Sequence, residues 1–446
     1  MQNILNKIQE LGGTAMLIGG AVIDSINGLP IKDWDIEVYG LNLWVIEKIL
    51  TDAGCSCNVV GKSFGVLKTR MEINGELVDV DLSIPRTENK IGVKHQDFEI
   101  SLNPNMTPQE AGRRRDLTIN AMYKNLHTDE IVDPFNGLED LKKGIIRVTD
   151  ERTFVEDPLR VLRIMQLLPR KGKVVDSKTM ELCQTMVDEF IHLPNERVFE
   201  EFSKLLLKAE KPSLGFEFLK ESGWIIHFPE LKDLIDCPQN PEWHPEGDVW
   251  VHTMMVIDNA AQLRKNLPED LQLAYMFGAL LHDIGKPATT VLPLCTAHGH
   301  AEVGAELSLD FMKRLTNSSK LIADVEHIVR LHMRPGQLFR STAKPASWKR
   351  LHNSFRLDVL GWISKADSSG RTGRSIEDVH EVSERCFELF DEFGTTAIEP
   401  IVKGRHLLSL GLTPGPEFKV ILDKAYELQL EGMTEIPEIL EELELQ

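Results

Sequence analysis

Cysteine is scarce in this chain of 446 residues, and the long apolar runs of membrane proteins are missing. The six cysteines are scattered and no two form a CxxC pair, which argues against a disulfide framework and indicates reduced thiols. No segment approaches the ~18–20 uninterrupted apolar residues that span a membrane, and the amphipathic N-terminal segment lacks the features of a signal peptide. We therefore expect a cytoplasmic protein, without membrane contact, of about two to four domains.

Positive charge is also in deficit, because 50 lysines and arginines face 69 acidic residues and the net charge is −19. This balance argues against indiscriminate binding of nucleic acids, since phosphate contacts dominate such binding. Basic residues nevertheless cluster at 113–115 and again between Arg160 and Lys173, whereas the C-terminal segment is rich in glutamate. A basic track on an acidic body favours one polyanion of defined shape.

Hydrophobic periodicity divides the chain into an α+β head and helical parts. Residues 14–40 follow the order strand, glycine turn, helix, loop, strand, and alternation returns at 57–70 and 77–84 around a turn at Asn74-Gly75. This pattern predicts a small mixed, mostly antiparallel sheet; after Pro134 the period becomes 3.6, which predicts helices up to a last one near 416–430. We expect a head, a helical neck and body, a second helical domain and a helical tail, at 1–135, 136–235, 236–390 and 391–446.

Two aspartates, Asp33 and Asp35, stand two apart on a predicted strand, so their carboxylates share one face. Paired hard oxygens suit Mg²⁺, and Asp81 on a neighbouring strand would complete a two-metal arrangement. By itself such a pair is also common on a solvated strand edge. Here Gly19 and Gly20 end the preceding strand and open a helix, which lets backbone N–H groups approach a triphosphate.

This order of parts resembles the polymerase-β-like nucleotidyltransferases. GGAVIDSINGLPIKDWDIEVYG resembles the first motif of bacterial tRNA nucleotidyltransferases (CCA-adding enzymes) and poly(A) polymerases, and GRRRDLTINAM resembles their second. EDPLRVLR resembles the nucleotide-selecting motif of class II of that family. The resemblance implies catalysis by Asp33, Asp35 and Asp81. The nucleotide-binding residues that it implies are Gly19, Gly20, Arg115, Asp157, Arg160 and Arg163.

The third motif also has a physical interpretation. Asp157 and Arg160 are three apart on a predicted helix and would share a face, where acceptor and donor groups can bind the Watson–Crick edge of C or A. The alternative is a surface salt bridge between them, worth a few tenths of a kcal/mol. The resemblance favours the first: protein side chains take the place of a nucleic-acid template.

One position departs from the family pattern GGxVRD, in which the arginine contacts the bound nucleotide. Here it is Ile23, which cannot bind phosphate or a base edge. Either Lys32 or Arg115 compensates, or nucleotide affinity is reduced, or the head has drifted from CCA addition. The segment after Asp81, RTENKIGVKHQDFE, resembles the flexible loop with which CCA-adding enzymes switch from C to A.

A second constellation lies in the helical part. His282 and Asp283 are adjacent, His252 lies upstream and Asp367 downstream, a mixed nitrogen and oxygen set that suits Mn, Fe, Ni, Co or Mg better than structural zinc. Adjacent His and Asp diverge on a regular helix, so a helix distortion is needed. Lys286 follows and could neutralise a bound phosphate.

This pattern resembles the HD phosphohydrolases, and in particular the HD domain fused to many bacterial tRNA nucleotidyltransferases, which is linked to phosphatase and 2′,3′-cyclic phosphodiesterase activity. His300 and His332 are candidate ligands of a second metal, His298 is a weaker candidate, and the roles of His244 and Asp248 stay open. The tail GRHLLSLGLTPGPEFKVILDKAYELQLEG also resembles that of the family.

The sequence thus predicts an enzyme that adds CCA to tRNA from CTP and ATP, with Mg²⁺ in the head and a transition metal such as Mn, Ni or Co in the HD domain. One alternative is addition of A alone or of poly(A). Another is a silent RNA-binding head on an HD phosphohydrolase. The sequence leaves the oligomeric state open, a homodimer included.

Overall fold

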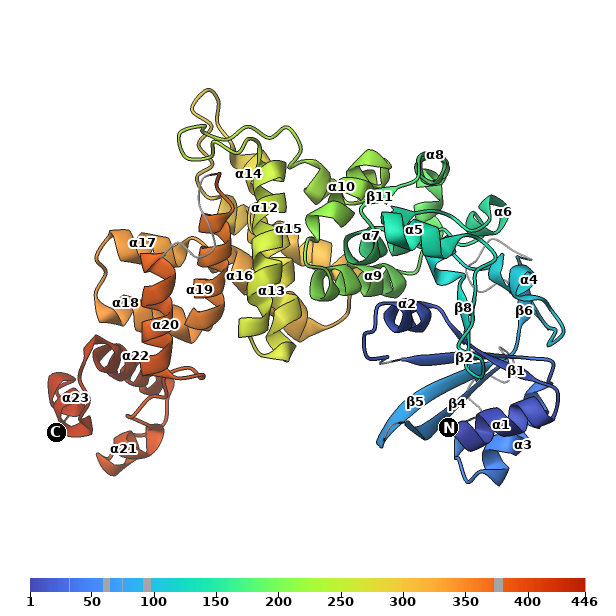
Figure 1. Ribbon diagram of the computed structural model, residues 1–446. Helices are drawn as coiled ribbons and strands as arrows, with labels where there is room; N and C mark the ends of the chain where they lie inside the picture. The colour runs from blue at the N-terminus through green and yellow to red at the C-terminus, as the bar shows by residue number, and fades with distance from the viewer. Residues whose placement is uncertain (32, 59–64, 74, 91–97, 373–379, 446) are drawn as a thin grey trace. The chain divides into compact units, whose positions relative to one another are not determined.

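The computed structural model describes every residue except 32, 59–64, 74, 91–97, 373–379 and 446. The chain forms two compact units, one of Met1–Leu205 with Leu214–His227, the other of Leu206–Ser213 with Phe228–Gln446. The predicted fold class, an α+β head followed by helical parts, is confirmed (Figure 1). Within the described part of the chain, no helix is long and apolar enough to cross a membrane.

A seven-stranded mixed sheet of order β3-β4-β5-β2-β1-β8-β9 forms the centre of the head. Its strands are β1 (Thr14–Ile18), β2 (Trp34–Tyr39), β3 (Cys57–Asn58), β4 (Val66–Ile73), β5 (Glu76–Ser83), β8 (Tyr123–Asn125) and β9 (Ile131–Val132). Neighbours are antiparallel except β2 and β5, which run parallel. The hairpin of β4 and β5 confirms the predicted turn, although Asn74 lies outside the described residues.

The head has its apolar core on one face of this sheet. Helices α1 (Gln2–Glu10) and α3 (Leu43–Asp52) pack there, and their isoleucines form one buried cluster with Val38, Leu67 and Val80. The amphipathic N-terminal helix predicted from the sequence is therefore confirmed as α1. Helix α2 (Gly20–Ile26) lies on the other side of the sheet (Figure 1), and Met16, Ile18, Tyr39 and Tyr123 of the strands belong to a second buried cluster.

The segment after Asp81 is not the continuous loop that the sequence suggested. Residues on both sides of 91–97 form an antiparallel ribbon of β6 (Arg86–Lys90) and β7 (Phe98–Leu102). The prediction of a flexible loop covered residues 86–99, and 91–97 lie outside the described residues. The ribbon forms because alternating residues on its two arms satisfy each other's backbone groups.

Helices dominate the chain after Pro134, as the change of period predicted. The first unit continues with α4 (Pro108–Gly112), η2 (Thr118–Asn120), α5 (Gly137–Lys143), β10 (Ile145–Ile146), α6 (Glu151–Phe154), α7 (Leu159–Lys171), β11 (Val174–Val175), α8 (Ser177–Thr185), η3 (Val187–His192), α9 (Asn195–Lys208), α10 (Ser213–Glu221) and η4 (Trp224–His227). The second unit is helical in its described part. Its elements are α11 (Pro229–Lys232), α12 (Val249–Leu263), η5 (Arg264–Asn266), α13 (Glu269–Leu281), α14 (Lys286–Thr289), α15 (His300–Leu315), α16 (Ser319–Leu331), α17 (Arg334–Arg340), α18 (Pro345–Ser354), α19 (Leu357–Ser369), α20 (Glu381–Phe393), α21 (Gly404–Ser409), α22 (Pro416–Glu431) and α23 (Ile436–Glu442).

The prediction that the last helix lies near 416–430 is wrong in one respect. Helix α22 matches it, but α23 follows. Ile439 of α23 is buried in a small cluster with Val402 and Ala425, so the glutamate-rich end of the chain still carries one apolar face. The hydrophobic pattern of the sequence did not reveal this short helix, because the segment is highly charged and only a few of its residues are apolar.

Trp224 is the largest side chain buried completely in the first unit's helical part, and its indole Nε1 donates to the carbonyl oxygen of Cys183 at 2.8 Å. We predict that Trp224→Ala lowers the free energy of unfolding by about 3–5 kcal/mol, the range for loss of a buried aromatic side chain. Urea denaturation measures this. Trp44→Ala is the matched control: its side chain is 66% exposed, so its effect should stay within about 0.5 kcal/mol. Equal effects would contradict the described core.

Candidate functional site

The glycine turn of the head leaves open space above the sheet. Gly19 follows β1 with φ of 66°, a conformation that favours glycine, and α2 begins at Gly20. A Cβ atom at either position would meet no atom within 4 Å. A ligand can therefore come close to the backbone here, as the sequence predicted.

Three carboxylates gather beside this turn. Asp35 lies on β2 and is the Cα partner of Asp81 on the parallel strand β5, while Asp33 just precedes β2. Burial, followed by the charges of Asp81 and Asp33, raises the pKa of Asp35. Nζ of Lys68 lies 3.0 Å from Oδ2 of Asp81. Among the described residues, these three carboxylates do not form a group within 4.8 Å, yet their repulsion favours a cation.

Glu37 is a charged residue of the site that the sequence analysis missed. It is fully buried on β2, where its Oε2 accepts from the hydroxyl of Tyr39 at 2.7 Å and its Oε1 accepts from Nη2 of Arg114 at 3.0 Å. Nη2 of Arg115 lies 3.8 Å from the same Oε1. Its spacing of two from Asp35 was visible in the sequence, but nothing local revealed its partners.

A cavity of about 430 Å³ brings the motifs together. Its lining residues are Gly19, Gly20, Asp35, Arg86, Arg114, Arg115, Asp116, Asn120, Asp157, Arg160, Arg163, Leu167 and Arg197. The predicted nucleotide-binding residues thus face one space, together with Asp35. Neither Arg86 nor Arg197 was predicted to bind the nucleotide: Arg86 was quoted only as the start of the segment after Asp81, and Arg197 belongs to none of the quoted motifs.

The expected placement of Asp157 and Arg160 on one helix is wrong, although both line the same cavity. Helix α7 begins only at Leu159, and Asp157 lies in the preceding turn, where its Oδ1 accepts from the Leu159 backbone N–H at 3.2 Å. Arg160 donates instead to the carbonyl oxygens of Thr153 and Arg114, at 2.8 and 2.6 Å. The proline at position 158 explains the shift, because it favours the first turn of a helix.

Arg163 is held by a buried carboxylate. Its Nε donates to Oδ2 of Asp116 at 2.7 Å, and the side chain of Asn120 donates to Oδ1 at 2.9 Å. Burial alone would raise the pKa of Asp116, but the charge of Arg163 together with the hydrogen bonds from Asn120 and Arg163 outweighs it, and the pKa falls to about 2. Helix α7 is thereby joined to the second motif at the edge of the cavity.

The structure bears on which residue could replace the family arginine that Ile23 lacks. Its side chain is buried, with 1% exposed. Lys32, one residue suggested to compensate, lies outside the described residues. Arg115, the other, is close to Glu37 and lies over the ring of Tyr123, with 5.4 Å between its Cζ and the ring centroid.

In the second unit the HD pair is presented by a helix end. Helix α13 ends at Leu281, so His282 and Asp283 lie in a turn before α14. His332 likewise follows directly after α16. The expected helix distortion is therefore a helix termination. Gly285 lets this turn pack closely against α15, because a Cβ atom there would lie 2.0 Å from the carbonyl oxygen of His300.

Asp283 lies close to two of the three groups of metal-type ligands in the described part of the chain. One group is His252, His282 and Asp367; the other is Asp283, His300 and His332; within each group the ligand atoms lie within 4.8 Å. Oδ2 of Asp283 is 3.1 Å from Nε2 of His282, and its Oδ1 is 3.4 Å from Nε2 of His300. The imidazole Nε2 atoms of His300 and His332 are 3.2 Å apart.

Glu246 is a second residue that the sequence analysis missed. Its buried carboxylate binds Nδ1 of His252 at 2.9 Å and Nδ1 of His244 at 2.8 Å. Burial would lower the pKa of His252, but Asp367 and Glu246 outweigh it and raise that pKa to about 9. Burial, followed by Lys286, lowers the pKa of His244 to about 4. Glu246 therefore orients both rings.

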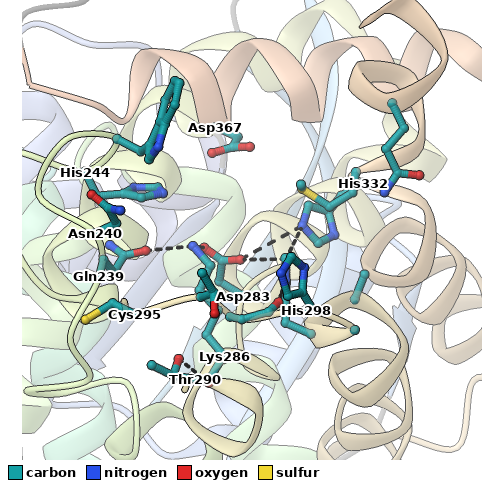
Figure 2. A pocket seen from close by; sticks show the side chains of 18 of the residues that line it. Gln239, Asn240, His244, Asp283, Lys286, Thr290, Cys295, His298, His332 and Asp367 are labelled. Carbon is teal, nitrogen blue, oxygen red and sulfur yellow. Dashed lines mark hydrogen bonds and ion pairs between the residues drawn. The ribbon is translucent and has the colours of Figure 1, made fainter. Parts of the chain in front are cut away.

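The structure gives Asp248, whose role the sequence left open, a place at a helix end, and it gives Lys286 protein partners. Asp248 caps α12, since its Oδ1 accepts from the Val251 N–H at 2.8 Å. Lys286 Nζ lies 2.7 Å from Oδ2 of Asp283 and donates to Gln239 (Figure 2), so it is not a cation reserved for phosphate.

A cavity of about 590 Å³ opens above this centre and includes His298 at its rim, outside both ligand groups. Trp243, 62% exposed, and Arg371 also line it. Nε of Arg371 is buried and makes no hydrogen bond within the described part. An aromatic face and a guanidinium beside a metal-type centre suit a nucleotide phosphoester.

Three protein families match successive segments of this chain, and two of these segments contain parts of the two sites. The Poly A polymerase head domain family matches residues 15–147, the family described as "Probable RNA and SrmB- binding site of polymerase A" matches 174–235, and the HD domain family matches 249–356. The "Multifunctional CCA protein" of Laribacter hongkongensis (strain HLHK9) is 34% identical over 368 residues, which cover 80% of this chain and 85% of that protein. The chain belongs to the multifunctional CCA protein family.

Solved structures of CCA-adding enzymes share the fold. The Bacillus stearothermophilus enzyme in complex with CTP has a TM-score of 0.68 at 19% identity, with 99% of this chain and 96% of that one covered. The Thermotoga maritima enzyme complexed with tRNA has a TM-score of 0.59 at 18% identity, covering 99% and 93%. The likeness therefore extends over the whole chain.

The family matches do not reach every part of the two sites. Asp157, Arg160 and Arg163 fall between the matched segments 15–147 and 174–235, and Glu246 and Asp367 fall outside 249–356. The structure nevertheless brings these residues to the two sites. Asp157, Arg160 and Arg163 line the head cavity, and Glu246 and Asp367 contact His252.

Proposed function

We propose that this chain completes tRNA 3′ ends with CCA, using CTP and ATP, and that its HD domain hydrolyses phosphoesters. The observation that carries the first part is the 430 Å³ cavity, where the glycine turn and Asp35 meet Asp157 and Arg160 from far along the chain. Membership of the multifunctional CCA protein family supports both parts. Because the chain belongs to this family, we also propose the four-part domain division, with the head at 1–135.

The head residues fit Mg²⁺, because Asp33 and Asp35 repel each other and Asp81 without a cation. When bound, the metal would stabilise charge on the phosphates. Asp81 would orient the tRNA 3′-hydroxyl and accept its proton. The hydroxyl oxygen then bonds to the α-phosphorus, the bond from that phosphorus to the bridging oxygen breaks, and pyrophosphate leaves.

Nucleotide choice falls to Asp157 and Arg160. Two carbonyl oxygens fix the guanidinium plane of Arg160, and a guanidinium has five N–H groups, so others remain for a base edge. The Leu159 N–H fixes the carboxylate of Asp157. Donor and acceptor groups held in this way can pair with C or A and leave G or U with unpaired polar groups.

The HD residues fit a transition metal, because buried Nε2 of His282 lies beside Oδ2 of Asp283 but makes no hydrogen bond among the described residues, and Glu246 binds Nδ1 of His252. We propose that His252, His282, Asp283 and Asp367 would hold one metal ion, and that Asp283, His300 and His332 would hold a second. Nitrogen and oxygen ligands favour Mn, Ni or Co. When bound, these ions would supply an activated water for phosphoester hydrolysis. Arg371 would bind the phosphate.

We predict that Asp35→Ala reduces CTP incorporation into tRNA lacking CCA by about a thousandfold or more, because a metal ligand worth several kcal/mol is lost. Radiolabelled CTP measures this. Asp79→Ala is the matched control: this neighbouring aspartate is 77% exposed and pairs with exposed Arg70, so incorporation should stay within about twofold. Near-native incorporation by Asp35→Ala would refute the proposed mechanism.

The two sites share no residue, so they should be separable. We predict that the double variant His282→Ala/Asp283→Ala loses bound metal and hydrolysis of 2′,3′-cyclic AMP, while nucleotide addition survives within a few-fold. Elemental analysis and both assays measure this. His327→Ala, which removes a histidine that is 43% exposed, should retain hydrolysis. Hydrolysis that persists in the double variant would contradict the HD assignment; complete loss of addition in a folded protein would contradict separate sites.

A further inference from the structure

A second, smaller cavity lies beside the carboxylates of the head. It measures about 230 Å³, and its lining residues are Gly20, Ala21, Ile23, Asp24, Asp33, Asp35, Asn120, Leu167, Arg170 and Lys171. It shares Gly20, Asp35, Asn120 and Leu167 with the 430 Å³ cavity. The proposed reaction centre at Asp35 therefore stands between two spaces of different size.

The cations of the smaller cavity come from the C-terminal end of α7. Lys171 is neutralised, because its Nζ lies 2.8 Å from Oδ1 of Asp24. This ion pair ties the end of α7 to α2 next to Ile23. Arg170 is half-buried, and among the described residues it makes no ion pair; its Nη1 donates to the neutral side chain of Gln166.

A half-buried guanidinium without a carboxylate partner is costly unless an anion arrives. Burial indeed lowers the pKa of Arg170, with Asp24 and Glu201 opposing this only in part. Ile23, on the same cavity wall, supplies no charge. Among the lining residues of the smaller cavity, Arg170 is therefore the cation left for a bound anion.

In a nucleoside triphosphate, the base lies on one side of the α-phosphate and the β- and γ-phosphates lie on the other. The base belongs in the larger cavity, where Asp157 and Arg160 lie. With the α-phosphate at Asp33 and Asp35, the β- and γ-phosphates then extend into the smaller cavity. We propose that Arg170 binds the β- and γ-phosphates of the incoming nucleotide, and the pyrophosphate that leaves. This inference rests on the proposed nucleotide addition.

Arg170 so placed contacts the part common to CTP, ATP and pyrophosphate, and no base. We therefore predict that Arg170→Ala and Arg170→Gln raise the KM for CTP and ATP by about tenfold or more, the loss of one charge-assisted hydrogen bond. The KM for pyrophosphate in the reverse reaction should rise similarly. The preference for C and A over G and U should not change, because Asp157 and Arg160 keep their places.

Steady-state kinetics with each triphosphate, and with pyrophosphate on tRNA ending in CCA, measure these values. Lys143→Ala, which removes an exposed lysine of the same unit paired with Glu139, should leave every KM unchanged. An unchanged KM in the Arg170 variants overturns the inference. So does loss of nucleotide preference together with the higher KM, which would assign Arg170 to the placement of α7. Absence of incorporation by the unaltered protein would contradict the proposed function instead.

Discussion

The buried carboxylate of Glu37 is the interaction on which the head depends. A carboxylate fully removed from water is stable only with charged or hydrogen-bonding partners, and Glu37 has Tyr39 and Arg114. The carbonyl oxygen of Arg114 in turn accepts from Arg160. A continuous path thus joins the strand that carries Asp35 to the arginine proposed to select the base. The catalytic and selecting groups are held in one geometry, as accurate addition without a template requires.

In the HD domain, the functional side chains are held together by one carboxylate, that of Asp283, which contacts two groups of histidines. Asp283 presents its two oxygens to different ligand groups, and the ending of α13 allows His282 and Asp283 to face the same centre. Glu246 holds His252 from behind, as hydrogen-bonded carboxylates do for metal-binding histidines. Both sites therefore gather acidic residues close together, with exposed Asp33 and Asp35 in the head and buried Asp283 in the HD domain, and in both the accumulated negative charge favours a cation.

Residue order was sufficient to predict the fold class and the two separate sites, because metal-type ligands and glycine turns form short local patterns. It failed where partners are distant. Lys171 and Asp24 are 147 positions apart, and Arg114 and Glu37 are 77 apart, so no local spacing reveals either pair. The placement of Asp157 on the same helix as Arg160 was wrong because α7 begins only after Pro158, although both residues line one cavity. The sequence indicated Arg170 only as part of a basic stretch. The smaller cavity that it lines forms only where the end of α7 lies beside α2.

The sequence of the added nucleotides tests the central claim most directly. tRNA transcripts that end before the first C, before the second C and before the A would be incubated with all four nucleoside triphosphates and Mg²⁺, and the extended ends would be sequenced. A protein that selects bases with fixed side chains should complete each transcript to CCA and stop there. Runs of A, mixed nucleotides or unextended tRNA would contradict it.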